Sequence, residues 1–363
     1  MTADISTARR STAPGRLGHP GMSLRTDPRT NPAVADALAP FGLDQNSGPA
    51  PVTPSSPREE LLEYASGAEA GFEAVFGALM SGIPPVQGIA SETRTTTGAD
   101  GNEIKLYVTR PESADGPLPC IYHVHGGGMV IIEGTGASYS RWREELAATG
   151  LVVVGVEFRN GAGSLGPHPF PAGLEDCASG LKWVNEHLAE LGVSNVVISG
   201  DSGGANLTLA LAIKAKREGF LDVISGVYAQ CPYIYGKWAD RTPEFPSLAE
   251  NDGYFLNRDM LQVLAEIYDP GSANIDEPTC WPTRATAADL KGLPPHVISV
   301  NEVDPLRDEG LDYYRKLLAA GVRTVGRMNL GVSHVGETMF RATMPEVYQA
   351  NIRDISGFAR SLT

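Results

Sequence analysis

A serine in a glycine-rich turn constrains this chain more than any other feature. The segment Gly200-Asp201-Ser202-Gly203-Gly204 has the form G-x-S-x-G, with a β-branched run before it and a run of good helix formers after it. A strand that enters a helix through so tight a turn needs small residues where the two approach, and the turn holds the serine hydroxyl exposed above the sheet edge. Taken alone, these five positions fit a plain glycine-rich turn equally well, so the rest of the chain has to decide.

The composition excludes several classes of protein. The 363 residues carry a net charge of −14 at pH 7, and such a surface repels phosphate groups, so we expect no nucleic acid partner. The longest apolar runs are far too short to cross a bilayer, and no apolar segment follows Arg9-Arg10, so we expect neither a membrane span nor a secretory signal. Four widely spaced cysteines without a C-x-x-C pair predict buried, reduced thiols in a cytoplasmic protein.

Composition and patterning divide the chain into four segments. Residues 1–88 hold an arm rich in proline, glycine, serine and threonine, followed by helical patterns. Strand-like and helix-like stretches then alternate over 89–232 and over 291–363, which predicts two parts of one α/β core. The aromatic-rich interval 233–290 interrupts this alternation. We expect it, together with the helices before residue 88, to form a cap over the strand ends, where open α/β sheets bind ligands.

Within the core, the later strands are continuous apolar runs, which is typical of parallel strands covered on both faces. The pattern predicts a doubly wound sheet that begins with an antiparallel hairpin. A helix is expected from Pro57, with Ser56 as its N-cap and a break near Gly67. The expected strands are 92–97, 104–109, 119–124, 151–158, 196–199, 224–230, 296–301 and 324–329. The other expected helices are 138–149, 174–191, 205–219, 258–268, 311–320 and 345–362.

A serine hydroxyl needs a base to take its proton, and His334 is the best candidate among the seven histidines. It lies in a short glycine-flanked loop after the last expected strand and before the last expected helix. Such a loop can carry an imidazole back across the sheet edge to a serine turn, whereas His187 lies within a helix and His296 begins a strand. The plain alternative is that His334 is a surface loop histidine.

The base in turn needs an acid to fix its tautomer and to stabilise the imidazolium. Asp304 directly follows the expected strand 296–301 and is the preferred candidate, while Asp308 and Glu302 remain alternatives. Asp308 also fits the first turn of the next helix, where negative charge suits the dipole. The order Ser202, Asp304, His334 is the order expected of an α/β-hydrolase.

Backbone N–H groups for an oxyanion are expected in the segment His125-Gly126-Gly127-Gly128, which follows the expected strand 119–124. Residues without side chains let the backbone close on a substrate carbonyl, so we assign donors to Gly127 and Gly128 and, after the nucleophile, to Gly203. A glycine triplet can also be a merely flexible loop.

Two other patterns carry less weight. Residues 161–166 match G-x-G-x-x-G, but a proline-rich stretch follows and cannot open a phosphate-binding helix, so no dinucleotide is expected. His123 and His125 share one face of a strand, but no third ligand stands near them, so neither a metal nor any other cofactor is expected. Asn206 heads a formal glycosylation sequon, but it falls in the helix behind the serine turn, where we expect it to be buried.

In combination these motifs resemble those of the hormone-sensitive-lipase-like carboxylesterases, over residues 90–363. The resemblance includes the H-G-G-G segment, the serine turn, residues 170–177 and the segment 304–309. It implies an α/β-hydrolase fold, with an eight-stranded, mostly parallel sheet, helices on both faces and a helical cap. Two departures stand out: Gly203 replaces the alanine usual in that family, and the segment 157–167 is longer than the usual pattern, so the shape of the pocket cannot be transferred there.

The expected function is therefore that of a serine carboxylesterase acting through an acyl-enzyme. The aromatic residues of the interval 233–290, Tyr254 and Phe255 in particular, are expected to bind a small-molecule substrate, an ester of short or medium acyl chain or a lactone. An amidase or acyltransferase of the same fold, or a non-catalytic receptor for a small ligand, are the alternatives. The sequence leaves the natural substrate and the oligomeric state open.

Overall fold

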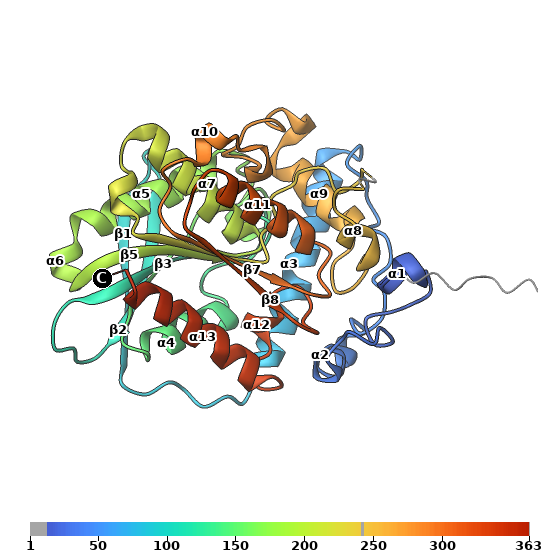
Figure 1. Cartoon of the computed structure of the whole chain (residues 1–363), viewed down its shortest axis with the longest axis horizontal. Helices are drawn as coiled ribbons and strands as arrows, with labels where there is room; N and C mark the ends of the chain where they lie inside the picture. The colour runs from blue at the N-terminus through green and yellow to red at the C-terminus, as the bar shows by residue number, and fades with distance from the viewer. Residues whose placement is uncertain (1–12, 241–242, 363) are drawn as a thin grey trace, which may run out of the picture.

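The computed structural model describes residues 13–240 and 243–362 and contains one eight-stranded sheet (Figure 1). The strands run in the order β1-β2-β4-β3-β5-β6-β7-β8. β2 is antiparallel to both β1 and β4, and every other neighbouring pair is parallel. The strands are β1 (Ile89–Thr97), β2 (Glu103–Pro111), β3 (Leu118–Val124), β4 (Val152–Val156), β5 (Val193–Asp201), β6 (Gly226–Gln230), β7 (His296–Asn301) and β8 (Thr324–Asn329).

Helices cover both faces of the sheet. Figure 1 shows α5, α7 and α11 on one face and α4 and α13 on the other. The helices are α1 (Gly15–Gly18), α2 (Pro32–Leu38), α3 (Arg58–Met80), α4 (Ala137–Ala147), α5 (Ala172–Glu186), α6 (Leu188–Leu191), α7 (Gly203–Glu218), α8 (Ser247–Glu250), α9 (Arg258–Tyr268), α10 (Ala287–Leu290), α11 (Arg307–Ala319), α12 (Gly336–Met339) and α13 (Pro345–Arg360). The expected α/β architecture is confirmed.

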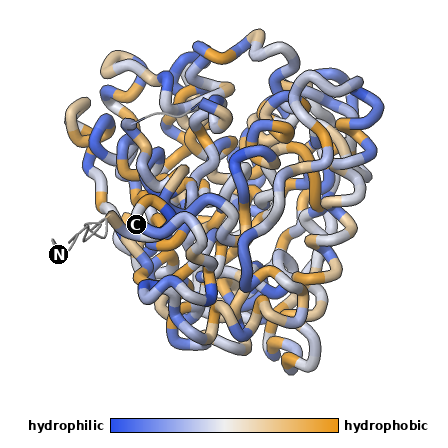
Figure 2. Tube along the Cα trace, turned by 90° about the vertical axis from the view of Figure 1, so that its right-hand side faces the viewer, coloured by the Kyte–Doolittle hydropathy of each residue, from blue (hydrophilic) through white to orange (hydrophobic). Residues whose placement is uncertain are grey.

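The burial of the strands follows their place in the sheet. Every residue of β4, β6 and β7 is buried, whereas the edge strand β8 is largely exposed. A separate apolar cluster packs between the sheet and the helices α4 and α13, around Trp142, Tyr348 and Ile355. The distribution of apolar residues along the chain can be followed in Figure 2. Burial on both faces explains why these strands are continuous apolar runs in the sequence.

Three local expectations are wrong. α3 runs without interruption through Gly67, and its N-cap is Pro57 with no side-chain hydrogen bond, so Ser56 does not cap it. The predicted helix over 174–191 is two helices, α5 and α6, because His187 leaves helical geometry and its Nδ1 bonds to the carbonyl of Trp183 at 2.7 Å.

The structure describes the N-terminal arm from residue 13, and its first twelve residues lie outside the described part of the chain. It holds α1 and α2 and packs against the segment 250–254. Arg29 pairs with Glu250, and the Tyr254 hydroxyl donates to Asp27 at 3.1 Å. The arm is thereby fixed beside the carboxyl ends of the central strands. No helix among the described residues is long and apolar enough to span a membrane.

Candidate active site

Ser202 lies at the sharp turn between β5 and α7. Its backbone is strained, with φ 55° and ψ −119°, in a region that side-chain-bearing residues rarely adopt. The flanking glycines are required by close approach: a Cβ on Gly200 would lie 2.5 Å from the carbonyl carbon of Gly204, and one on Gly204 would collide with the carbonyl oxygen of Val124. The plain-turn interpretation therefore does not describe this segment, because the turn lifts Ser202 into a cavity.

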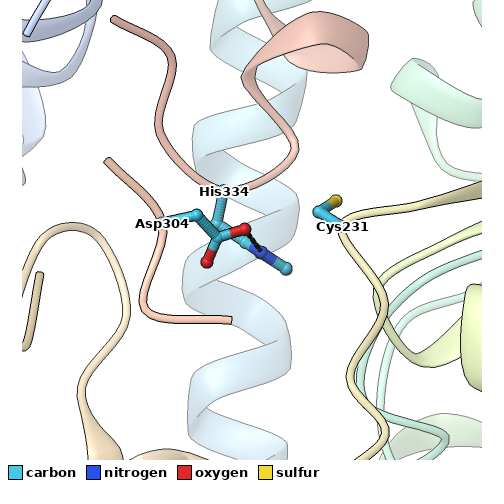
Figure 3. Close-up of side chains that lie close together, drawn as sticks. All are labelled: Cys231, Asp304 and His334. Atoms are coloured by element: carbon cyan, nitrogen blue, oxygen red, sulfur yellow. Dashed lines mark hydrogen bonds and ion pairs between the residues drawn. The ribbon is translucent and has the colours of Figure 1, made fainter. Parts of the chain in front are cut away.

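Three side chains from distant parts of the chain meet at this turn. His334 Nε2 lies 2.9 Å from Ser202 Oγ. On the other side of the ring, His334 Nδ1 lies 2.8 Å from Asp304 Oδ2, a contact that is drawn in Figure 3. A carboxylate can only accept, so Nδ1–H donates to Asp304 and Nε2 is free to accept from the serine hydroxyl. All three residues are buried. The arrangement is that of a nucleophile, a base and an orienting acid.

The alternative acids do not reach the histidine. Asp308 Oδ2 accepts from the backbone N–H of Ser247 at 2.7 Å, and Oδ1 pairs with Arg307. Glu302 Oε2 accepts from the backbone N–H of Gly331 at 2.8 Å. Asp308 therefore lies at the start of α11, and Glu302 holds the start of the loop that carries His334. Of the three candidates, only Asp304 contacts the imidazole.

The surroundings of His334 favour its protonated form. Burial alone lowers the pKa of this histidine, but the charge and hydrogen bond of Asp304, with the charges of Glu337 and Asp201, outweigh burial and raise it above its ordinary value. Burial raises the pKa of Asp201 to about 6 and that of Glu337 to about 7. Asp201 and Glu337, whose charges both act on His334, therefore titrate near neutral pH.

Glu337 is a residue to which the sequence reasoning gave no role. Asn301 Nδ2 donates to Glu337 Oε2 at 2.5 Å and to the backbone carbonyl of Ser333 at 2.8 Å. Asn301 Oδ1 accepts from Asn329 at 2.8 Å, so the network joins β7, β8 and the His334 loop. The only signal in the sequence was an acid three positions after the histidine, in an otherwise apolar stretch.

The glycine loop after β3 adopts backbone conformations that favour glycine. Gly127 has φ 102° and Gly128 has φ 64°, and the Gly127 carbonyl accepts from the N–H groups of Val130 and Ile131. A Cβ on Gly203 would lie 2.5 Å from the Gly128 nitrogen, so this loop lies directly against the start of α7. In the described part of the chain no acceptor pairs with the N–H groups of Gly127, Gly128 or Gly203.

Tyr139 links the two glycine segments. Its hydroxyl accepts from the Gly126 N–H at 2.8 Å and donates to Asp201 Oδ2 at 2.9 Å. The H-G-G-G loop is thus tied to the serine turn through one buried phenol. The sequence alone offered no reason to select Tyr139, because its role depends on α4 packing against the sheet so that the phenol reaches both Gly126 and Asp201.

A small apolar cavity of about 50 Å³ opens at Ser202 and His334. Side chains from α3 and α9 form part of its wall, as does Phe255. Tyr254 does not line it, since this side chain is fully buried and bonds to Asp27, so its expected substrate contact is not found in this cavity. The remaining wall residues include Phe72, Phe76, Ile131, Tyr233, Met260 and Leu264.

Cys231, Asp304 and His334 form a buried group whose ligand atoms lie within 4.8 Å of one another (Figure 3). Asp304 and His334 are already bonded to each other, and burial raises the pKa of the Cys231 thiol well above its usual range. A neutral thiol is a poor metal ligand, so the group fits an orienting pair beside a buried cysteine better than a metal centre.

The other chemistry-bearing residues have structural partners. His123 Nε2 lies 3.9 Å from Asp201, and His125 stacks on Phe158 at 4.2 Å between ring centres. Asn206 is buried and donates to the carbonyls of Tyr233 and Cys280, as expected for a sequon that cannot be glycosylated in the folded chain. The four cysteines are free and buried, as predicted.

Comparison with known proteins gives consistent matches. The profile of a family described as having an alpha/beta hydrolase fold matches residues 121–337. The carboxylesterase NlhH of Mycobacterium tuberculosis is 34% identical over 274 residues, which cover 74% of this chain and 82% of that protein. The solved structure of brefeldin A esterase, described as a bacterial homologue of human hormone-sensitive lipase, is 44% identical, with a TM-score of 0.94, and covers 97% of this chain and 99% of that one. That of esterase Est22 is 37% identical, with a TM-score of 0.83, and covers 93% and 99%.

Proposed function

Because this chain belongs to the family with the alpha/beta hydrolase fold and is a carboxylic ester hydrolase, we propose that it cleaves esters through an acyl-enzyme on Ser202, with His334 as base and Asp304 as orienting acid. The observation that carries the proposal is the position of His334 between the other two side chains, at 2.9 Å and 2.8 Å.

In the first half of the reaction, Ser202 Oγ attacks the ester carbonyl carbon while its proton passes to His334 Nε2. The new C–O bond places the negative charge on the former carbonyl oxygen. The C–O bond to the alcohol then breaks, and His334 gives the proton to the departing oxygen. Asp304 keeps Nδ1–H in place and stabilises the imidazolium throughout.

In the second half, a water molecule takes the place of the alcohol. His334 removes one of its protons, the oxygen attacks the acyl carbon, and the bond to Ser202 Oγ breaks as the proton returns to the serine. The products are the carboxylic acid and the free enzyme, so no cofactor enters the balance.

The N–H groups of Gly127, Gly128 and Gly203 are the proposed donors to the oxyanion. Their freedom from other acceptors and the contact between Gly128 and Gly203 support this assignment. Donors fixed in place before the reaction stabilise the developing charge without reorganising, which accounts for a large share of catalysis in such sites.

The proposed substrate is a small ester or a lactone with an apolar acyl or alcohol part, because the wall of the cavity is largely apolar. The name of one structural neighbour states that it is an esterase of brefeldin A, and we extend that substrate to this chain only as a candidate. A cytoplasmic location belongs to the same proposal, supported by four free, buried cysteines.

The test is hydrolysis of p-nitrophenyl esters of increasing acyl length, with one macrocyclic lactone added to the panel. Covalent labelling of Ser202 by a fluorophosphonate separates an esterase from a receptor of the same fold, and product analysis with an added amine or alcohol separates hydrolysis from acyl transfer. Failure to hydrolyse any ester, together with no labelling of Ser202, would overturn the proposal.

A further inference from the structure

A second, larger cavity of about 590 Å³ lies beside the one at Ser202. It is lined by the arm residues 41–51, by one side of α3 and by the segment from Phe255 to Met260. These three parts are far apart in the sequence, and the site proposed above uses only a few of their side chains.

The two cavities share three wall residues, Phe72, Phe255 and Met260. The Phe72 and Phe255 rings meet edge to face, with centres 5.7 Å apart. Phe255 also has φ 67°, a left-handed conformation that an aromatic residue adopts only when its surroundings enforce it. Two rings, one of them on a strained backbone, therefore separate the compartments.

The sizes of the two cavities differ by an order of magnitude. One water molecule needs about 10–15 Å³ of such space, so the 50 Å³ beside Ser202 holds only a few non-hydrogen atoms. An ester with a longer arm has to place that arm elsewhere. A cavity of about 280 Å³ also shares walls with the one at Ser202, but it is lined by the acid Glu73. The cavity of about 590 Å³ is the larger of the two and has no charged residue in its wall, so it suits an apolar arm better.

We infer that this second cavity is a distal subsite that binds the apolar chain of the ester substrate, and that the contacting rings of Phe72 and Phe255 move apart to admit the chain. The inference rests on the proposed function, since it assumes that the ester bond is held at Ser202. The predicted ligand is an uncharged hydrocarbon chain or ring, because none of the sixteen lining residues carries a charge.

The wall formed by the arm is held in place by hydrogen bonds. Asn257 Nδ2 donates to Ser47 Oγ at 3.1 Å and to the Gly48 carbonyl at 2.9 Å, and Ser47 N–H donates to the Gly253 carbonyl at 2.9 Å. The side-chain amide of Asn257 therefore donates its hydrogen bonds to the protein, so the wall of the cavity remains apolar at this residue.

Gly67 and Gly71 lie one turn apart on the cavity side of α3, and a Cβ on either would meet no atom within 4 Å. Neither has a positive φ, so both accept larger residues without backbone strain, and replacing glycine within a helix favours the helix. Leucine at either position should fill the cavity without harming the fold. Gly77, on the same helix, also meets no atom within 4 Å and lines neither cavity, which makes Gly77→Leu the matched control.

The experiment compares long and short esters in two series, because either side of the ester could carry the chain. The acyl series uses p-nitrophenyl octanoate against p-nitrophenyl acetate, and the alcohol series uses hexyl acetate against ethyl acetate. Burial of one methylene is worth roughly a fourfold change in binding. We expect Gly71→Leu and Gly67→Leu to lower the long-to-short ratio of kcat/KM at least tenfold in one series, whereas Gly77→Leu keeps the wild-type ratio.

Binding measured without catalysis separates the two proposals. Calorimetry on Ser202→Ala should show at least tenfold tighter binding of the long ester in the sensitive series, and adding Gly71→Leu should remove that gain. Such a result with no hydrolysis by the wild-type protein would overturn the esterase mechanism and keep the subsite. Ratios and affinities unchanged by both leucine variants in both series would overturn the subsite and leave the cavity to some other occupant.

Discussion

Ser202 Oγ and His334 Nε2 lie 2.9 Å apart, although 132 residues separate them in the chain. The contact exists because β5 ends in the serine turn while the loop after β8 returns across the same edge of the sheet. Asp304, just past the end of β7, completes the contact from the other side at 2.8 Å. Parallel strands bring their carboxyl ends to one edge, so segments distant in the sequence meet there.

Replacing the nucleophile should abolish hydrolysis and leave the fold intact. Ser202→Ala removes the only hydroxyl that contacts His334 Nε2 in the described part of the chain, and we expect kcat to fall on the order of 10⁴-fold or more. Ser199→Ala is the matched control, because the Ser199 hydroxyl is buried on β5, three positions before Ser202, and has no hydrogen-bond partner in the described part of the chain. Initial rates on p-nitrophenyl butyrate and thermal unfolding of both variants check this. Substantial turnover by Ser202→Ala would contradict the assignment.

Activity should rise with pH as His334 loses its proton, since only the neutral imidazole can act as a base. The net effect of Asp304, Glu337 and Asp201 raises the pKa of His334 above 6.5 despite burial. The acid limb of kcat/KM should therefore have its midpoint above pH 6.5. A profile measured from pH 5 to 9 tests this, and a midpoint below 6.5 or a flat profile would exclude the histidine base.

Glu337 should change the pKa of His334 without contacting the substrate. Its charge raises the pKa of His334, so Glu337→Gln should move the acid limb of kcat/KM to lower pH. The glutamine can still accept from Asn301, which preserves the loop. Glu346→Gln, an exposed change at the start of α13, is the control. An unmoved limb would show that Glu337 acts only on the structure of the loop.

The same substitution should change how stability depends on pH. Burial raises the pKa of Glu337 from an ordinary 4.5 to about 7, so the folded state holds this proton more tightly than the unfolded state does. Through Glu337 alone, the wild-type protein loses about 3 kcal/mol of stability as the pH rises from 4.5 to 7, at 1.36 kcal/mol per unit. Glu337→Gln should escape that loss, so its advantage in urea unfolding should be absent near pH 4 and largest above pH 7. Equal pH dependence of both proteins would contradict this.

The oxyanion donors can be tested at Gly127. A Cβ there would collide with the Ile131 carbonyl oxygen, and φ 102° is unfavourable for alanine. Gly127→Ala should therefore displace the N–H groups of the loop and lower kcat by about 10²–10³-fold. Gly219→Ala is the control for the cost of placing alanine at a positive φ, because Gly219 has φ 78° and follows the end of α7, far from Ser202. A Cβ on Gly219 would meet no atom within 4 Å. Similar kinetic losses in both variants would remove Gly127 from the oxyanion site.

The apolar pattern and the turn residues predicted much of the fold, because where a strand or helix begins and ends depends largely on the residues next to it. The strands β7 and β8 have the predicted bounds, since Gly, Pro and charged residues end them on both sides. The break expected in α3 does not occur, because contacts with the core outweigh the low helix propensity of Gly67. The end of α5 was missed because it depends on a bond between His187 and the backbone, which hydrophobic periodicity does not report.

The sequence by itself determined the chemistry: a serine turn, a loop histidine, an acid after a strand and a glycine loop, in an order that fits one fold. Tertiary structure decided everything that depends on which side chains meet. It separated Asp304 from Asp308 and Glu302, turned Tyr254 away from the cavity at Ser202, and placed Glu337 beside the base. The physical reason is that the residue types and their order can be read from a short stretch of sequence. The distances between side chains and the burial of each one arise only when remote segments pack together.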